Sequence, residues 1–320
     1  MTSLNVLWKN GVTDWAASRL SGFARDWTRK EPFDWRALLA CLIGGVILWP
    51  LVDRLPVLGM DWYTYFYPRV FEGIYPPWTG PVLTPFVWVP WRASLSLMNS
   101  LMLVTVAVAT AREARRFSLA SRLGAVAMAT TAPTLLMLLW QGNVDGLVLL
   151  GLVALPPGVV LALIKPTIAG WALLARRQWT LWAIGFGVVS LVIWGWWPGS
   201  LMHAFDGRFL HPMAMGWHNL GWPVALMGLI LLAFTNADPM RLMAAGSFLA
   251  PYVMPNHYLL FLPALGRVSG WRRWVLWGWA WVVGLVPGFT GITRYLALGF
   301  PLAVWFLLKE KDSKTPAYQD

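Results

Sequence analysis

The chain has 320 residues, of which 58% are apolar and only 12% are charged, whereas soluble domains carry about 25% charged residues. With a mean hydropathy of +0.57 and 24 tryptophans, this composition excludes an ordinary soluble domain. It predicts an all-α polytopic membrane protein with about ten crossings of roughly 20 residues each. The net charge of +11 is no nucleic-acid signature, because the basic residues gather in segments that alternate with near-neutral ones, as the positive-inside rule expects.

Three regions are predicted. Residues 1–36 form a cytoplasmic amphipathic segment, residues 37–308 the transmembrane domain, and residues 309–320 a cytoplasmic tail. The first region carries six basic residues, and apolar side chains recur in it at roughly helical spacing, which favours a helix on the membrane surface over a disordered tail. It is not a cleaved signal peptide by pattern, because the first apolar run begins only at Ala37.

Both termini are then expected in the cytoplasm of a multi-pass protein of a plasma membrane, which we expect to be bacterial. The apolar runs place the crossings at 37–52, 93–110, 123–140, 146–155, 179–197, 221–234, 243–254, 258–265, 274–289 and 295–308.

The segment 146–175 is apolar but interrupted by Pro156-Pro157-Gly158 and by Lys165-Pro166. It predicts a shortened span followed by two half-helices hinged at Lys165-Pro166, with one long kinked span as the alternative. Broken helices are tolerated at membrane depth where they line a cavity.

The stretch from Met60 to Pro77 follows the first span and lies in the first predicted outer loop. It places one carboxylate, Asp61, at the head of a run of tyrosines and prolines. Asp61 is the candidate general base of a membrane enzyme. The alternative is a solvated acid within an aromatic interfacial belt.

No motif of a soluble enzyme is present. The sequence has no P-loop, no dinucleotide-binding glycine turn after a strand, and no His and Cys set at zinc spacing. The single cysteine, Cys41, excludes a disulfide within the chain. We therefore predict no cofactor and no metal ion.

Several short motifs occur in a particular order along the membrane domain. They are Asp61 with Tyr63, Tyr65 and Tyr67-Pro68; Tyr75-Pro76-Pro77 and Thr84-Pro85-Phe86 before a span that contains Asn99; Gln141-Gly142-Asn143; Ile164-Lys165-Pro166; His218-Asn219; and Ala250-Pro251, His257-Tyr258 and Leu262-Pro263. This order resembles the polytopic GT-C glycosyltransferases, most closely the polyprenol-phosphate-mannose-dependent enzymes of glycosyltransferase family 87. That family shows Gly-Gln-Xaa-Asn where this chain has Gln-Gly-Asn. The chain is also short for the family, which leaves room for a membrane partner subunit.

The resemblance implies transfer of a mannose-like sugar from a polyprenyl-phosphate donor to a glycan or glycolipid acceptor, with inversion, on the outer side of the bilayer. Asp61 would take the proton of the acceptor hydroxyl, and cationic side chains would stabilise the leaving phosphate. The scheme requires no metal, although Asp61 and Asp145 could hold one. The residues implied for substrate binding are Lys165, Arg69, Arg294 and His257 for the phosphate, and Tyr63, Tyr67, Gln141, Asn143, Asp145, Asn219 and Tyr258 for hydroxyl groups.

Structural roles remain open for these residues. Lys165 could snorkel to the interface, Asp145 could be a helix N-terminal acid, and Arg69 and Arg294 could anchor lipid headgroups. His203, Asp206 and His211 favour an ordinary polar loop over a metal site. Two other functions also stay open: a small transporter or lipid flippase, and a non-catalytic membrane assembly subunit.

Overall fold

The computed structural model describes residues 20–69, 75–199, 216–285 and 291–308, together with Asp14, Ala17 and Ser18. Every regular element in this part of the chain is helical, which confirms the predicted all-α class. The polar residues of the second predicted outer loop, His203, Asp206 and His211, and the predicted tail 309–320 lie outside the described residues.

A helical stretch at residues 20–28 precedes the membrane domain. The elements that follow are α2 (Trp35–Val52), η1 (Trp62–Phe66), α3 (Thr79–Leu83), η2 (Thr84–Trp88), α4 (Trp91–Glu113), α5 (Leu119–Thr130), α6 (Pro133–Gln141), α7 (Asp145–Val153), α8 (Val159–Ala162), α9 (Pro166–Leu173), α10 (Arg177–Trp194), α12 (Trp217–Leu220), α13 (Trp222–Ala233), α14 (Pro239–Ser247), η3 (Pro255–Gly266), α15 (Trp271–Leu285), η4 (Gly291–Leu298) and α16 (Gly299–Leu307).

Two of the described helices, α2 and α4, are long and apolar enough to cross a membrane. The pair α5 and α6 would form a third crossing, with a bend of 47° between its halves. The described part of the chain therefore holds two or three candidate crossings and not the predicted number of about ten, although the apolar segments occur close to where the sequence placed them.

Prolines explain why the remaining apolar segments are short. A proline stands at the first or second position of α6, α9, α13, α14 and η3, where its fixed φ suits a helix start but ends whatever helix came before it. The 12 residues of α13 reach only about 18 Å, against a hydrocarbon core of about 30 Å. The predicted hinge at Lys165-Pro166 is confirmed, because α9 begins at Pro166.

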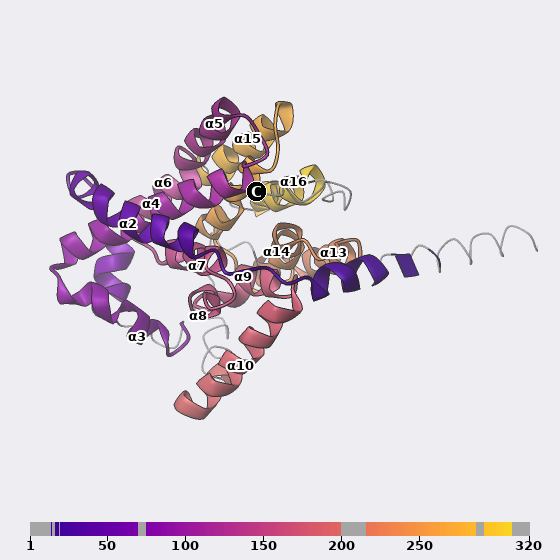
Figure 1. Ribbon diagram of the computed structural model, residues 1–320, viewed down its shortest axis with the longest axis horizontal. Coiled ribbons are helices and arrows are strands. Elements are labelled where there is room, and N and C mark those ends of the chain that lie inside the picture. The colour runs from indigo at the N-terminus through magenta and orange to yellow at the C-terminus, as the bar shows by residue number, and fades with distance from the viewer. Residues whose placement is uncertain are drawn as a thin grey trace, which may run out of the picture.

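Helix α4 is the centre of the bundle. Met98, Met102 and Val106 on α4 are fully buried and belong to one core with Val148 of α7 and Phe261 of η3. Helix α2 packs along α4, and Figure 1 shows α6 and α7 beside the same helix. The core is thus assembled around a helix that is buried over most of its length.

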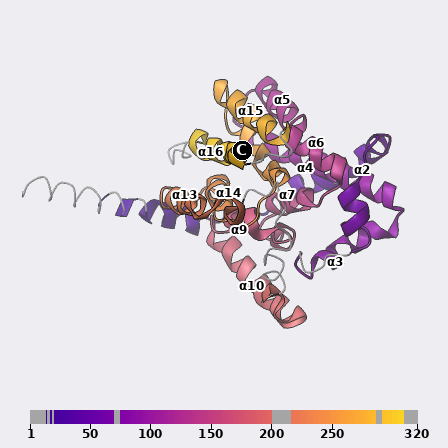
Figure 2. The ribbon, with the colours of Figure 1, turned by 180° about the vertical axis from the view of Figure 1, so that it is seen from behind.

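Apolar side chains also cover much of the outside. On α2, Ile47 is 72% exposed, and on α10, Val192 is 81% exposed. Figures 1 and 2 show α10 projecting away from the rest of the bundle. A contiguous exposed apolar surface of this kind marks contact with lipid or with another protein, which fits a chain with candidate membrane spans.

Charged residues pair at the ends of the helices that the sequence assigns to the cytoplasm. Arg267 donates to both carboxylate oxygens of Asp238, and the Arg176 guanidinium lies 2.7 Å from Glu31. Burial by itself would raise the pKa of Asp238, but the Arg267 guanidinium outweighs it and holds the pKa below its usual value. These pairs fasten the N-terminal segment and the start of α14 to the bundle.

Candidate functional site

The site begins with the contact of two glycines in left-handed conformations. Gly59 has a φ of 61° and Gly142 a φ of 73°, and the Gly59 amide donates to the Trp140 carbonyl oxygen at 2.9 Å. A Cβ on Gly142 would lie 2.5 Å from Leu95 and 2.8 Å from the Trp62 Cβ. Only glycine therefore permits both the chain reversal after α6 and the approach of the loop that carries Asp61.

This contact places Asp61 beside Asn143. The Asn143 side-chain amide donates to Asp61 Oδ2 at 3.1 Å. Asn143 Oδ1 accepts from the Val144 amide at 2.7 Å and from Lys165 Nζ at 2.8 Å. Because both of these donors face the oxygen, the NH₂ group of Asn143 must point at Asp61.

Lys165 joins Asn143 to a second carboxylate. Its Nζ lies 2.6 Å from Asp145 Oδ2, and the two side chains are 10% and 0% exposed. Asp145 is the first residue of α7, where the helix dipole favours a negative charge. Lys165 precedes Pro166, the first residue of α9. The hinge in the broken segment thus carries the cation that neutralises a fully buried acid.

His257 and Tyr75 complete the surroundings of Lys165. The Nζ lies 3.5 Å from His257 Nε2 and 5.7 Å from the centroid of the Tyr75 ring. The Met254 amide donates to His257 Nδ1 at 3.4 Å. A neutral imidazole accepts a hydrogen bond through only one of its nitrogens. If Nδ1 is the acceptor, Nε2 carries the proton, and the Lys165 ammonium then packs against the ring without a hydrogen bond.

The charges of this cluster do not balance. Two carboxylates, Asp61 and Asp145, share one cation, Lys165, and Lys165 is closest to Asp145. Burial raises the pKa of Asp61 above its usual value, and the Lys165 charge and the Asn143 hydrogen bond offset this only in part. The raised pKa means that Asp61 accepts a proton more readily than an ordinary aspartate does, as a general base must.

Gln141 is the last residue of α6, two positions before Asn143. Its Oε1 accepts from the Asn256 side-chain amide at 3.3 Å, which ties the end of α6 to the residue before His257. Asp145 Oδ1 and Asn256 Oδ1 are buried and have no hydrogen-bond partner among the described residues. Such atoms are costly to leave unsatisfied, and they mark positions that a bound hydroxyl group or water could fill.

The structure places two of the predicted tyrosines away from Asp61 and its neighbours. Tyr63 is 59% exposed and packs its ring on Trp91, with centroids 5.2 Å apart. The Tyr67 hydroxyl donates to the Val89 carbonyl oxygen at 3.1 Å. Both contacts tie the loop after Asp61 to the start of α4, so the structure gives these residues a local structural role.

Arg69 lies in a separate hollow of about 560 Å³ that Gly80, Pro81 and Thr84 also line. Its guanidinium lies 3.4 Å from Thr84 Oγ1, and its backbone has a φ of 60°, which is uncommon outside glycine. Unlike Lys165, this exposed cation forms no ion pair with a carboxylate in the described part of the chain, and its side chain is accessible to an anion from solution.

Three further predicted residues belong to η3, α12 and η4. Tyr258 is fully buried, and its ring packs on Phe261 and Phe300 at 5.5 and 6.1 Å between centroids. Asn219 is on the short helix α12. Arg294 is in η4, next to Tyr295, whose hydroxyl donates to the Leu220 carbonyl oxygen at 2.8 Å. That bond holds η4 against α12.

Three residues near the cluster were not among the predicted site residues. They are Tyr75 beneath Lys165, Asn256 bonded to Gln141, and Tyr252, whose ring centroid lies 6.3 Å from that of His257. Tyr75 and Asn256 each occur within or beside a motif singled out in the sequence, Tyr-Pro-Pro and His-Tyr. The motifs therefore pointed to the segments that form the site, but they did not indicate which side chain would face Lys165.

No group of three or more His, Cys, Asp or Glu side chains that could hold a metal ion occurs in the described part of the chain. Asp61 and Asp145 are instead linked through Asn143 and Lys165. The ammonium group thus contacts Asp145 directly and reaches Asp61 through the Asn143 side chain.

Comparison with known proteins gives no assignment. No family model, no curated protein and no solved structure matches the chain.

Proposed function

We propose that the protein is a membrane glycosyltransferase that moves a sugar from a polyprenyl-phosphate donor to an acceptor hydroxyl, with Asp61 as general base. The observation that carries the proposal is the meeting of Asp61, Asn143, Asp145, Lys165 and His257, which come from distant parts of the chain. Four of the five lie in the motifs that the sequence singled out, and Asp145 follows one of them, Gln141-Gly142-Asn143, by two positions. Polar clusters inside an apolar helical protein are expensive and are usually functional.

The chemistry requires one base. Asp61 takes the proton of the acceptor hydroxyl as its oxygen attacks the anomeric carbon, and the bond from that carbon to the phosphate oxygen breaks with its electrons on the phosphate. A single displacement inverts the anomeric configuration. Asn143 holds Asp61 Oδ2, so we assign the proton to Oδ1.

The charge distribution assigns different tasks to the cations. Lys165 forms an ion pair with Asp145 at 2.6 Å. It therefore holds the two acids and Asn143 in place. We assign the donor phosphate to Arg69, which lies over an open hollow. A guanidinium binds phosphate through parallel N–H bonds.

The decisive experiment is a transfer assay on purified protein with radiolabelled polyprenyl-phosphate sugars, run beside Asp61→Asn. We expect transfer by the wild type and its loss in the variant. Full activity of Asp61→Asn would remove the proposed base. Absence of transfer with every donor, together with uptake of solute into vesicles, would favour a transporter instead.

That second candidate has its own support. A buried pair of Lys165 and Asp145 with His257 beside it is the kind of intramembrane group that proton-coupled transporters use. Vesicle flux that depends on a proton gradient would identify this function, and a Lys165→Met variant would abolish it.

The proposed function also includes a multi-pass topology with both termini in the cytoplasm, in which short helices cross in broken pairs. Cys41 is fully buried and should react little with a thiol reagent. The labelling of a single introduced cysteine therefore shows on which side of the membrane it lies. Trp88→Cys, at a position 78% exposed, should react with an impermeant thiol reagent from outside. Leu119→Cys, at a position 65% exposed, should react only after lysis. The reverse pattern would invert the topology.

A further inference from the structure

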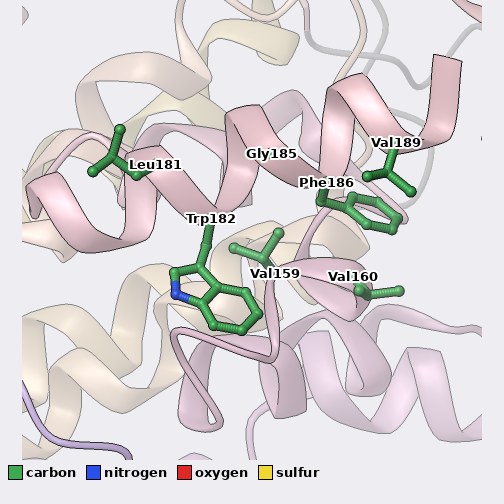
Figure 3. A pocket seen from close by; sticks show the side chains of 7 residues that line it. All are labelled: Val159, Val160, Leu181, Trp182, Gly185, Phe186 and Val189. Atoms are coloured by element: carbon green, nitrogen blue, oxygen red, sulfur yellow. The ribbon is translucent and has the colours of Figure 1, made fainter. Parts of the chain in front are cut away.

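An apolar hollow of about 470 Å³ lies between α8 and α10. Figure 3 shows Trp182 and Phe186 reaching from α10 toward Val159 and Val160, with Gly185 between them. Every side chain that lines the hollow is apolar. Because Gly185 has no side chain, and no other part of the protein lies within 4 Å of where its Cβ would be, the hollow is open along the middle of α10.

The inner end of this groove is tied to the region of the polar site by Trp78. The Trp78 indole nitrogen donates to the Val160 carbonyl oxygen at 3.1 Å, and its ring stands edge-on to Phe186 with centroids 4.8 Å apart. Tyr75, three positions earlier in the sequence, lies under Lys165. Val160 likewise precedes Lys165 by only a few positions, so the same two chain segments supply the groove and border the site.

The short helix α3 separates the groove from the hollow of Arg69. Trp78 stands at the N-terminal end of α3, whereas Gly80, Pro81 and Thr84 line the Arg69 hollow. The five residues of α3 cover about 8 Å. A cationic hollow and an apolar groove on either side of one helical turn match a molecule with an anionic head and one apolar tail.

We infer that the groove between α8 and α10 binds the isoprenoid tail of the donor, with its phosphate at Arg69. This inference rests on the proposed function. A polyprenyl phosphate has one chain, which this groove can receive, whereas a membrane phospholipid has two. A cavity of about 150 Å³ holds one benzene, so a hollow of about 470 Å³ accepts roughly three units of isoprene size. Affinity should therefore rise with chain length over the first few units and then level off.

Two glycines of α10 provide a matched pair of variants. Neither Gly185 nor Gly187 has another part of the protein within 4 Å of a built Cβ, so both positions leave open space where a side chain would begin. Only Gly185 lines the groove, because the two positions are about 200° apart around the helix. Gly185→Leu fills the groove, and Gly187→Leu makes the same change on the opposite face.

The experiment measures equilibrium binding of tritiated undecaprenyl phosphate to the full chain in phosphatidylcholine nanodiscs. We expect Gly185→Leu to weaken binding roughly tenfold, because it displaces at least two methylene groups of the chain. Gly187→Leu should bind like the wild type. Dimethylallyl phosphate, which is too short to fill the groove, should bind equally to all three proteins. Competition by farnesyl phosphate should exceed that by dimethylallyl phosphate.

Equal effects of the two leucine variants, or no effect of Gly185→Leu, would overturn the inference. Equal competition by dioleoyl phosphatidic acid would also overturn it, because the groove would then be an ordinary phospholipid position. The binding assay is independent of transfer. If Gly185→Leu weakens binding but no sugar is transferred, the groove assignment stands and the proposed glycosyltransferase function fails. If sugar is transferred but Gly185→Leu leaves binding unchanged, the function stands and the groove assignment fails.

Discussion

Asn143 donates a hydrogen bond of 3.1 Å to Asp61, although 82 positions separate the two residues in the sequence. The other end of the same side chain accepts from Lys165 and from the Val144 amide. Asn143 therefore fixes the carboxylate of Asp61 relative to the Lys165–Asp145 ion pair. Five testable predictions follow from this arrangement and from the charge pairs at the opposite ends of the helices.

The first prediction concerns Asp61→Asn. We expect transfer to fall by roughly 10²–10⁴-fold, the usual contribution of a general base. Because burial raises the pKa of Asp61, the folded protein disfavours the ionised form, and a neutral isostere should fold at least as well. The assay is sugar transfer together with the thermal midpoint in detergent.

Asp53→Asn is the matched control for this variant. Asp53 follows α2 and accepts a hydrogen bond of 2.7 Å from Ser96, whereas the hydrogen bonds of Asn143 and Lys165 go to other residues. Its amide variant should retain transfer. An equal loss in both variants would indicate a general effect of removing a negative charge from this loop.

The second prediction is a pH dependence. Asp61 acts as a base only when ionised, so kcat/KM should decline as the pH falls through its raised pKa and level off above it. The Asn143 hydrogen bond lowers that pKa, so Asn143→Leu should raise it further and move the acid limb to higher pH. Ser96→Ala, which removes the donor to Asp53, should leave the acid limb in place. An unchanged limb in Asn143→Leu would separate Asn143 from the base.

The third prediction concerns the buried ion pair. Lys165→Met leaves Asp145 buried and unpaired, and removal of one partner from such a pair costs about 3–5 kcal/mol. The double variant Lys165→Met/Asp145→Leu should recover much of that stability, because an apolar pair of similar volume is tolerated. Thermal midpoints of the single and double variants test this. A single variant as stable as the wild type would mean that Asp145 has another partner or is neutral.

The fourth prediction concerns the glycine that brings the two loops together. Gly142→Ala should abolish transfer and lower the thermal midpoint, because a left-handed alanine costs about 1–2 kcal/mol and its Cβ would lie 2.5 Å from Leu95. Gly170→Ala in α9 is the control, since its Cβ would lie 3.7 Å from Pro166, an ordinary contact. Retained transfer in Gly142→Ala would show that the reversal after α6 does not position Asp61.

The fifth prediction concerns Asp238 and Arg267. The folded protein holds the pKa of Asp238 below its usual value, so the pair stabilises the fold above the ordinary pKa of an aspartate, and that stability is lost as the pH falls through the lowered value. Asp238→Asn should therefore lower the thermal midpoint at neutral pH, and its difference from the wild type should shrink in acid. A difference independent of pH would assign the effect to the cap of α14 alone, where Asp238 accepts from the Met240 and Arg241 amides.

The sequence by itself determined the all-α class and the positions of the apolar segments, because hydropathy is a local property of a short window. It also singled out Lys165, because a lysine within an apolar run carries a cost that suggests a function, whereas Asp61, Asn143, Asp145 and His257 were named from the resemblance in motif order. Proline positions indicated the hinge before α9, because the missing amide hydrogen and the fixed φ of a proline affect only the residues next to it.

Only the tertiary structure decided which of these residues meet. It paired Lys165 with Asp145, placed Tyr258 among core aromatic rings, and put Arg69 in a different hollow. It also showed that most apolar segments are shorter than a membrane is thick. These outcomes depend on how distant segments approach, and that approach is set by close backbone contacts such as that of Gly59 with Gly142, whose packing partners no local pattern in the sequence specifies.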